Sequence, residues 1–301
     1  MRGAPLAQTL DATCRSFTDH LPPAMRSYAS TLPHRLGLTP DPHGRWEDFW
    51  VLAINRDLPG YAADDPDRPA KLVIPARVLE RFRAAHHCAI VHCLIADRLV
   101  DRQVMPDLHM VVLRDLFLQL WEHQLCEAMD DQAQGRGALA VALVALRRGT
   151  QQEIRCIQRR ALDAATYAVQ TRDKLRWGST AAASMLRMAG HPGRAVLLER
   201  AYDRFCFALQ CLDDALDCEE DQATRGMTMP SLLGVPEGAL VRAVPPILDS
   251  AIRMVEEARL PRLSGWMRSF QKLASRIRPG GRESANLAQG RKLAAAADEV
   301  L

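Results

Sequence analysis

Apolar residues recur along almost the whole chain at spacings of three and four, which is the period of an amphipathic helix. No stretch shows the sustained alternation of apolar and polar residues that indicates a strand. The pattern predicts helices over 5–30, 45–57, 74–103, 107–130, 136–148, 150–172, 174–190, 194–220, 237–258, 260–277 and 284–300. Turn-rich stretches such as AGHPG and RPGG separate them. We therefore predict a single all-α domain over 1–301, a bundle whose central helices are surrounded by others.

The composition is that of an ordinary water-soluble protein. The chain has 301 residues, of which 48% are hydrophobic and 25% charged, and its net charge of +3 is too small to indicate a nucleic-acid partner. No stretch reaches the roughly 18 uninterrupted apolar residues of a membrane span, and the N-terminal segment lacks the apolar run of a signal peptide. The eight cysteines form no C-x-x-C pair, as expected for reduced thiols in the cytoplasm.

Three aspartates interrupt the apolar pattern of the helix predicted over 194–220, in the segment ALQCLDDALDCEED. Asp213 and Asp217 lie four apart and share one helix face, with Asp214 about a quarter-turn aside. A second pair, Asp97 and Asp101, lies in the apolar segment CLIADRLVDRQ. Buried unpaired carboxylates are costly, and Mg²⁺ bound together with substrate phosphate would offset that cost. The alternative is a pair of solvated or salt-bridged helix surfaces.

Several segments resemble the trans-isoprenyl diphosphate synthases. LQCLDDALDCEEDQATRGMTMPSLL is similar to their second aspartate-rich region, F-Q-x-x-D-D-x-x-D followed by G-D and T-x-P. The matching residues are Gln210, Asp213, Asp214, Asp217, Asp221, Thr228 and Pro230. Tyr167 precedes Lys174 by seven residues, as a tyrosine precedes the diphosphate-binding lysine of that family, and GTQQE at 149–153 resembles its glycine-glutamine segment. CLIADRLVDRQ falls where the first aspartate-rich motif belongs, so the resemblance covers roughly 80 to 235.

The resemblance implies the class I terpenoid synthase fold, a helical bundle around a central cavity. It implies three Mg²⁺ ions held between two acidic helices by Asp97, Asp101, Asp213, Asp214 and Asp217. Asp97, Asp101, Asp213 and Lys174 would then be catalytic, and Gln210 and Lys174 would bind a prenyl diphosphate, with Arg102, Arg172 and Arg225 as helpers. A homodimer is compatible with this resemblance.

The chain departs from the family pattern at several positions, among them the N-terminal segment that binds a second substrate, isopentenyl diphosphate. The first motif has Arg98 in place of its second aspartate, and the N-terminal G-K-R segment has no counterpart. Leu175 replaces a threonine and Met227 a lysine, with Arg225 two residues earlier. We therefore expect ionisation and cyclisation of one prenyl diphosphate rather than chain elongation. The alternatives are a prenyltransferase that uses another acceptor, and a non-catalytic partner subunit of a prenyl synthase.

Small residues precede the first acidic motif on the same helix face. Cys93 and Ala89 lie one and two helical turns before Asp97, so they would leave depth in the wall of a hydrocarbon cavity. On this interpretation the substrate is C15 or longer. The alternative is that small residues here allow two helices to pack closely. Trp177 and Phe207 could line the same cavity and stabilise a cation, although ordinary core packing also explains such residues.

Overall fold

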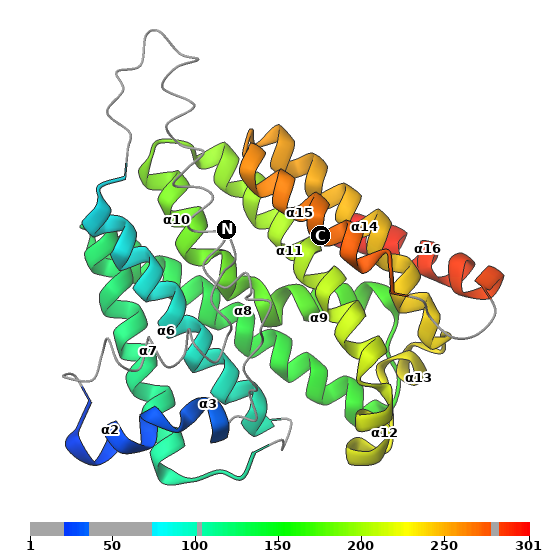
Figure 1. Ribbon diagram of the computed structural model, residues 1–301, viewed down its shortest axis with the longest axis horizontal. Helices are drawn as coiled ribbons and strands as arrows, with labels where there is room; N and C mark the ends of the chain where they lie inside the picture. The colour runs from blue at the N-terminus through cyan, green and yellow to red at the C-terminus, as the bar shows by residue number, and fades with distance from the viewer. Residues whose placement is uncertain (1–20, 36–73, 101–103, 278–282) are drawn as a thin grey trace, which may run out of the picture. The chain divides into compact units, whose positions relative to one another are not determined.

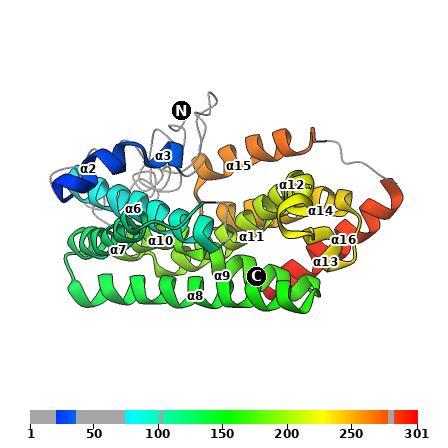
Figure 2. The same cartoon turned by 90° about the horizontal axis from the view of Figure 1, so that it is seen from below.

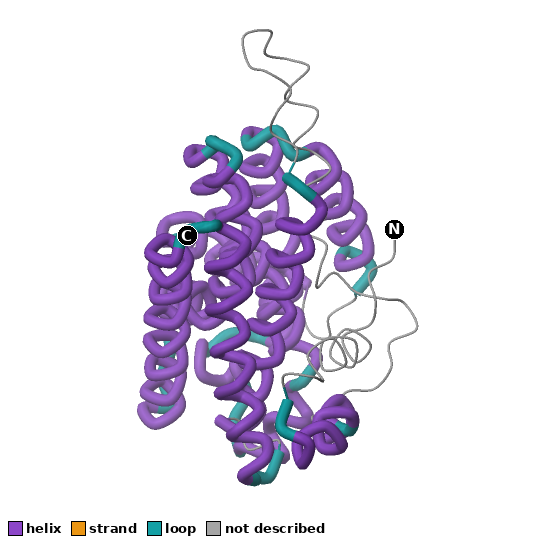
Figure 3. Tube along the Cα trace, turned by 90° about the vertical axis from the view of Figure 1, so that its left-hand side faces the viewer, coloured by secondary structure: helices purple, strands orange, loops and turns teal. Residues whose placement is uncertain are grey.

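The computed structural model describes residues 21–35, 74–100, 104–277 and 283–301. Within these ranges the regular elements are helices and there is no strand (Figures 1 and 3), which confirms the predicted all-α class. The helix predicted over 45–57 and the first part of that over 5–30 lie outside the described residues. None of the described helices combines the length and apolar character needed to cross a membrane.

The described chain divides into two compact units. One holds the described residues up to Ala140 together with Thr180–Gly190, and the other holds Val141–Ser179 and His191–Leu301. The second acidic motif and Lys174 belong to the second unit, whereas Asp97 belongs to the first. The assignment of 1–301 to a single domain stays a prediction.

The first unit is built around two long helices that lie side by side (Figure 1). Its elements are α2 (Pro23–Ser30), α3 (Leu32–Arg35), α6 (Ala76–Val100), α7 (Leu108–Met129), the start of α8 (Gln132–Arg159) and α10 (Thr180–Met188). α6 packs along α7, and α10 contacts both. Phe82, Phe117 and Trp121 are fully buried between these helices, so a core of large apolar side chains fixes the unit.

The second unit is centred on α11. Its elements are the rest of α8, α9 (Ala164–Leu175), the 3₁₀ turn η2 (Arg176–Ser179), α11 (Pro192–Leu216), α12 (Cys218–Arg225), α13 (Met229–Leu233), α14 (Glu237–Glu257), α15 (Pro261–Ala274) and α16 (Glu283–Val300). α11 packs against α9 and α14, and α14 in turn contacts α15 and α16 (Figure 2). Because other helices cover α11 on several sides, most of its residues are buried. This is why its sequence shows no narrow apolar stripe.

The predicted helix break near Gly149 is wrong, because α8 continues through that residue. A Cβ atom at 149 would lie 2.9 Å from the backbone carbonyl carbon of Asp173 and closer still to the backbone nitrogen of Lys174. The glycine therefore permits α8 to approach the backbone of α9, rather than ending a helix. α8 ends instead at Arg159, and Asp163 then caps α9 by accepting a hydrogen bond from the Thr166 backbone N–H.

The acidic segment also ends its helix earlier than predicted. α11 stops at Leu216, with Asp217 as its C-terminal cap, and the remainder of the predicted helix over 194–220 belongs to α12. The short helix α13 was not predicted; a capping box between Thr228 and Ser231 starts it. These boundaries place Asp213 in the last turn of α11 and Asp217 just beyond it.

Candidate functional site

The three aspartates of the second acidic motif occupy different environments at the end of α11. Asp213 and Asp217 are exposed, and Asp214 is buried. The expectation that all three interrupt a buried face is therefore wrong for two of them. The last turn of α11 has one face that no other described helix covers. Asp213 lies on this face, and Leu216, three residues later, is exposed on it as well.

Asp214 is held by polar partners from two helices. Its carboxylate accepts hydrogen bonds from the Tyr167 hydroxyl of α9 and from Gln210 Nε2, the latter at 3.0 Å. Burial, together with the neighbouring charge of Asp213, raises the pKa of Asp214 to about 7 against the lowering effect of these bonds and of the Lys174 charge. Phe207 packs edge-on against the Tyr167 ring, with 5.0 Å between centroids. In the described structure Gln210 and Phe207 thus support Asp214 and Tyr167.

Lys174 forms an ion pair that the sequence analysis missed. Its Nζ atom lies 2.9 Å from Glu153 Oε2, and the two side chains are only 15% and 9% exposed. Glu153 is the last residue of the GTQQE segment and lies one helical turn after Gly149, on the face of α8 that approaches α9. The segment was recognised by its resemblance, but the pairing depends on the crossing of α8 and α9.

Two of the other predicted binding residues of this unit, Arg172 and Trp177, lie in α9 and in η2, and the third, Arg225, lies in α12. Arg172 donates from Nε to Asp173 Oδ1 at 3.0 Å and from Nη1 to the Val300 carbonyl at 3.3 Å, so its guanidinium is directed towards the end of α16. Trp177 is half-buried in η2. Arg225 is the last residue of α12, and its side chain is outside the described set. Their roles in binding substrate stay predictions.

The predicted residues of the first unit lie on α6. Ala89 and Cys93 are buried and Asp97 is half-buried. Burial raises the pKa of the Cys93 thiol, and the charge of Asp97 adds to this effect, which is consistent with their sharing a helix face. Asp101 and Arg102 lie outside the described residues. That Asp97 and Asp213 bind the same metal ions stays a prediction.

The carboxylate oxygens at the end of α11 are the type of ligand that Mg²⁺ prefers. In the described ranges, no group of three or more His, Cys, Asp or Glu side chains is arranged to hold a metal by itself. Asp213 and Asp217 nevertheless offer exposed carboxylate oxygens at the C-terminal end of a helix, where the helix dipole favours a cation. Mg²⁺ commonly takes one or two carboxylates and completes its shell with water and substrate phosphate, which these two residues can satisfy.

A second buried carboxylate on α11, Asp203, should give the protein a pH-dependent stability. Burial, with a smaller contribution from the charge of Glu199, raises the pKa of Asp203 to about 6, although Arg176 and Arg172 lower it. Because the pKa of Asp203 is higher in the folded state, its protonated carboxyl stabilises the fold fully below the ordinary pKa near 4. This stabilisation is lost as the pH rises through about 6. Against Asp203→Asn, the wild type should therefore lose up to about 3 kcal/mol of relative stability between pH 4 and 7. Urea unfolding of both proteins across this range measures the difference, and parallel curves would contradict it.

The comparisons with known proteins identify the fold. No protein-family model matches the chain, and no curated protein sequence matches it. Among solved structures, the crystal structure of the polyprenyl synthetase from Streptomyces coelicolor A3(2) is similar to it, with a TM-score of 0.56 and 15% sequence identity. The similarity covers 98% of this chain and 97% of that chain. The chain therefore has the all-α fold of a polyprenyl synthetase.

Proposed function

We propose that this protein is a Mg²⁺-dependent enzyme that ionises an allylic prenyl diphosphate of C15 or longer, cyclises the hydrocarbon and releases diphosphate. The observation that carries the proposal is the polar constellation of α9 and α11. It combines the exposed Asp213 and Asp217, the buried Asp214 with its partner Tyr167, and the enclosed Lys174.

The burial of these charges favours a functional role over a structural one. Asp214 is 7% exposed, and the Lys174–Glu153 pair is nearly enclosed. Apolar residues of similar volume at such positions are often as stable as a buried ion pair or more so, so packing alone does not require these charges. Strongly perturbed ionisable groups cluster at binding and catalytic sites. A non-catalytic partner subunit would have no physical need for this arrangement.

Each side chain has a role that follows from its environment. Lys174 contributes a localised positive charge for the oxygens of the diphosphate, and Glu153 holds its ammonium in place. Tyr167 and Gln210 orient Asp214. The charge neutralisation that the leaving diphosphate needs is supplied by Mg²⁺, which Asp213 and Asp217 would hold. We expect the small side chains of Ala89 and Cys93, which are both buried, to leave depth for a long hydrocarbon in an apolar wall.

The product analysis distinguishes cyclisation from chain elongation. Purified protein is incubated with C10, C15 or C20 allylic diphosphates and Mg²⁺, with and without isopentenyl diphosphate, and hexane extracts are analysed by mass spectrometry. We expect terpene hydrocarbons from C15 or longer substrates and no consumption of isopentenyl diphosphate, because the N-terminal G-K-R segment that would bind this second substrate has no counterpart in the sequence. Products longer by five carbons would instead establish a chain-elongating synthase. If diphosphate were released without any hydrocarbon product, and if adding a nucleophilic acceptor increased that release, the result would favour a prenyltransferase.

A further inference from the structure

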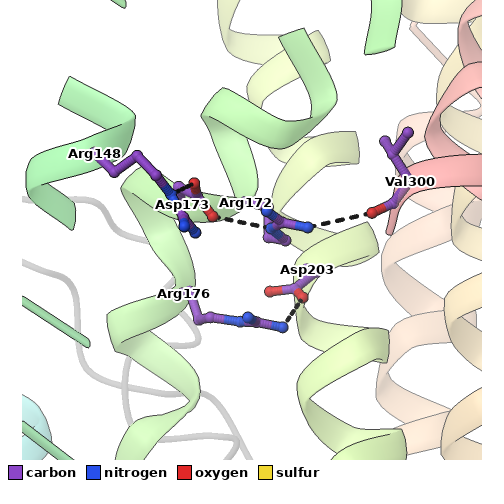
Figure 4. Close-up of polar contacts among 6 residues, drawn as sticks. All are labelled: Arg148, Arg172, Asp173, Arg176, Asp203 and Val300. Carbon is purple, nitrogen blue, oxygen red and sulfur yellow. Dashed lines mark hydrogen bonds and ion pairs between the residues drawn. The ribbon is translucent and has the colours of Figure 1, made fainter. Parts of the chain in front are cut away.

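Two buried carboxylates and the arginines paired with them lie beside Lys174 and have no part in the chemistry proposed above (Figure 4). Asp173, the centre of this cluster, is 1% exposed and accepts hydrogen bonds from Arg148 Nε of α8 and from Arg172 Nε of α9. Asp203 of α11, equally enclosed, accepts from Arg176 Nη2 at 2.7 Å. Two buried carboxylates of this unit are therefore each paired with arginine, and the side chain of Arg148 is mostly exposed.

One short segment of α8 contacts both Asp173 and Lys174. Arg148 reaches Asp173, and Glu153 reaches Lys174 at 2.9 Å. Between them, Gly149 lies so close to α9 that a Cβ there would come within 2.9 Å of the Asp173 carbonyl carbon. Two side-chain pairs and one backbone contact thus join α8 to two consecutive residues of α9. Rotating α9 so as to move Lys174 away from Glu153 would also separate Asp173 from Arg148.

Arg172 extends the same cluster to a third helix. Its Nε atom bonds Asp173, and its Nη1 atom bonds the Val300 carbonyl at the end of α16 (Figure 4). Asp173 is therefore restrained from α8 directly and from α16 through Arg172. A carboxylate buried between two arginines is no more stable than an apolar core residue, but it is more directional, because hydrogen bonds to a carboxylate fix angles as well as distances.

We propose that Asp173 is a positioning residue that fixes the rotation of α9, so that the ammonium group of Lys174 stays against Glu153 in the orientation used to bind diphosphate. The importance of Lys174 for substrate rests on the proposed function, whereas its orientation does not. Asp173 touches neither substrate nor metal in this account and acts through the backbone of its neighbour.

The orientation of Lys174 can be measured directly, because the chain has only four lysines. Brief acetylation followed by peptide mass spectrometry gives the modification rate of Lys174, with the exposed Lys272 and Lys292 as internal references. We expect Asp173→Asn to increase the relative rate at Lys174 by about fivefold, since the ammonium group leaves Glu153 more often. Arg148→Gln, a change at a mostly exposed side chain, should increase it in the same direction and is the variant to use if Asp173→Asn folds poorly.

Asp203→Asn is the matched control. It removes the other arginine-paired buried carboxylate of the cluster, which is paired with Arg176 of η2 rather than with a residue of α8, and it should leave the Lys174 rate unchanged. An unchanged Lys174 rate in Asp173→Asn, or an equal increase in Asp203→Asn, would overturn the proposal. Either result would mean that the cluster only stabilises the unit. All rates are measured well below the melting temperature of each variant, so that global unfolding does not contribute.

Binding of inorganic diphosphate with Mg²⁺, measured by calorimetry on the same proteins, separates this proposal from the proposed function. We expect Asp173→Asn to weaken binding by about tenfold and Asp203→Asn to leave it at the wild-type value. If wild-type protein binds no diphosphate, the proposed function fails, while the acetylation rates still decide whether Asp173 orients Lys174. If Lys174 is displaced in Asp173→Asn but diphosphate binds as in wild type, Asp173 has no role in binding and the proposal is overturned.

Discussion

Asp213→Ala should lower the rate of diphosphate release by about a thousandfold, because in the proposed function it removes a carboxylate that would hold the Mg²⁺ needed to neutralise the leaving group. The fold should survive the change. Asp213 is exposed in the last turn of α11, so its removal leaves no cavity, and we expect the free energy of unfolding to change by no more than about 0.5 kcal/mol. Steady-state assays of diphosphate release and thermal melting of the same preparation measure both effects.

Glu220→Ala provides the control for Asp213→Ala. Glu220 is an exposed carboxylate in the first turn of α12, a few residues further along the chain, and no role in metal binding is assigned to it. Its removal changes the local charge equally and should leave the rate near that of the wild type. If Glu220→Ala reduced the rate as much as Asp213→Ala, the effect would come from net charge and not from a metal ligand.

Gly149→Ala should destabilise the protein by about 3 kcal/mol, the upper end of the usual cost of overpacking. The added methyl group would come within 2.9 Å of the Asp173 carbonyl carbon and the Gln170 carbonyl oxygen, and nearer to the Lys174 nitrogen. These are backbone atoms, so α8 and α9 must separate to relieve the overlap. Urea unfolding monitored by circular dichroism measures the loss.

Gly137→Ala on the same helix is the matched change. A Cβ at Gly137 would meet nothing within 4 Å, and alanine favours the helix by up to about 1 kcal/mol over glycine. We therefore expect Gly137→Ala to stabilise the protein slightly. Equal stabilities for the two variants would show that α8 does not approach α9 at Gly149.

The sequence predicted the helices that turn residues bound on both sides. The ranges predicted for α6, α7 and α14 agree with the structure to within three residues at the ends that it describes, because apolar periodicity and the flanking turn residues point to the same limits. Gly149 was misinterpreted because a glycine that ends a helix and one that admits a neighbouring backbone look alike in sequence. The turn before Asp163 was missed because the apolar pattern continues across it.

The candidate site was predictable in its residue types but not in its pairings. The spacing of Tyr167, Lys174 and the three aspartates identified the helices involved, and Tyr167 does bond Asp214. Which aspartate is buried depends on how α11 packs against α9, which local sequence does not determine. Glu153 was missed for a similar reason, since its partner Lys174 lies on another helix and is reached only where α8 crosses α9.

Metal-dependent release of diphosphate by the wild-type protein is the most direct test of the account. C15 and C20 allylic diphosphates are incubated with purified protein, either with Mg²⁺ or with a chelator, and free diphosphate is quantified over time. The account predicts release with Mg²⁺ and none above the protein-free rate with the chelator. Absence of release from every allylic diphosphate in the presence of Mg²⁺ would contradict it and favour a non-catalytic partner subunit.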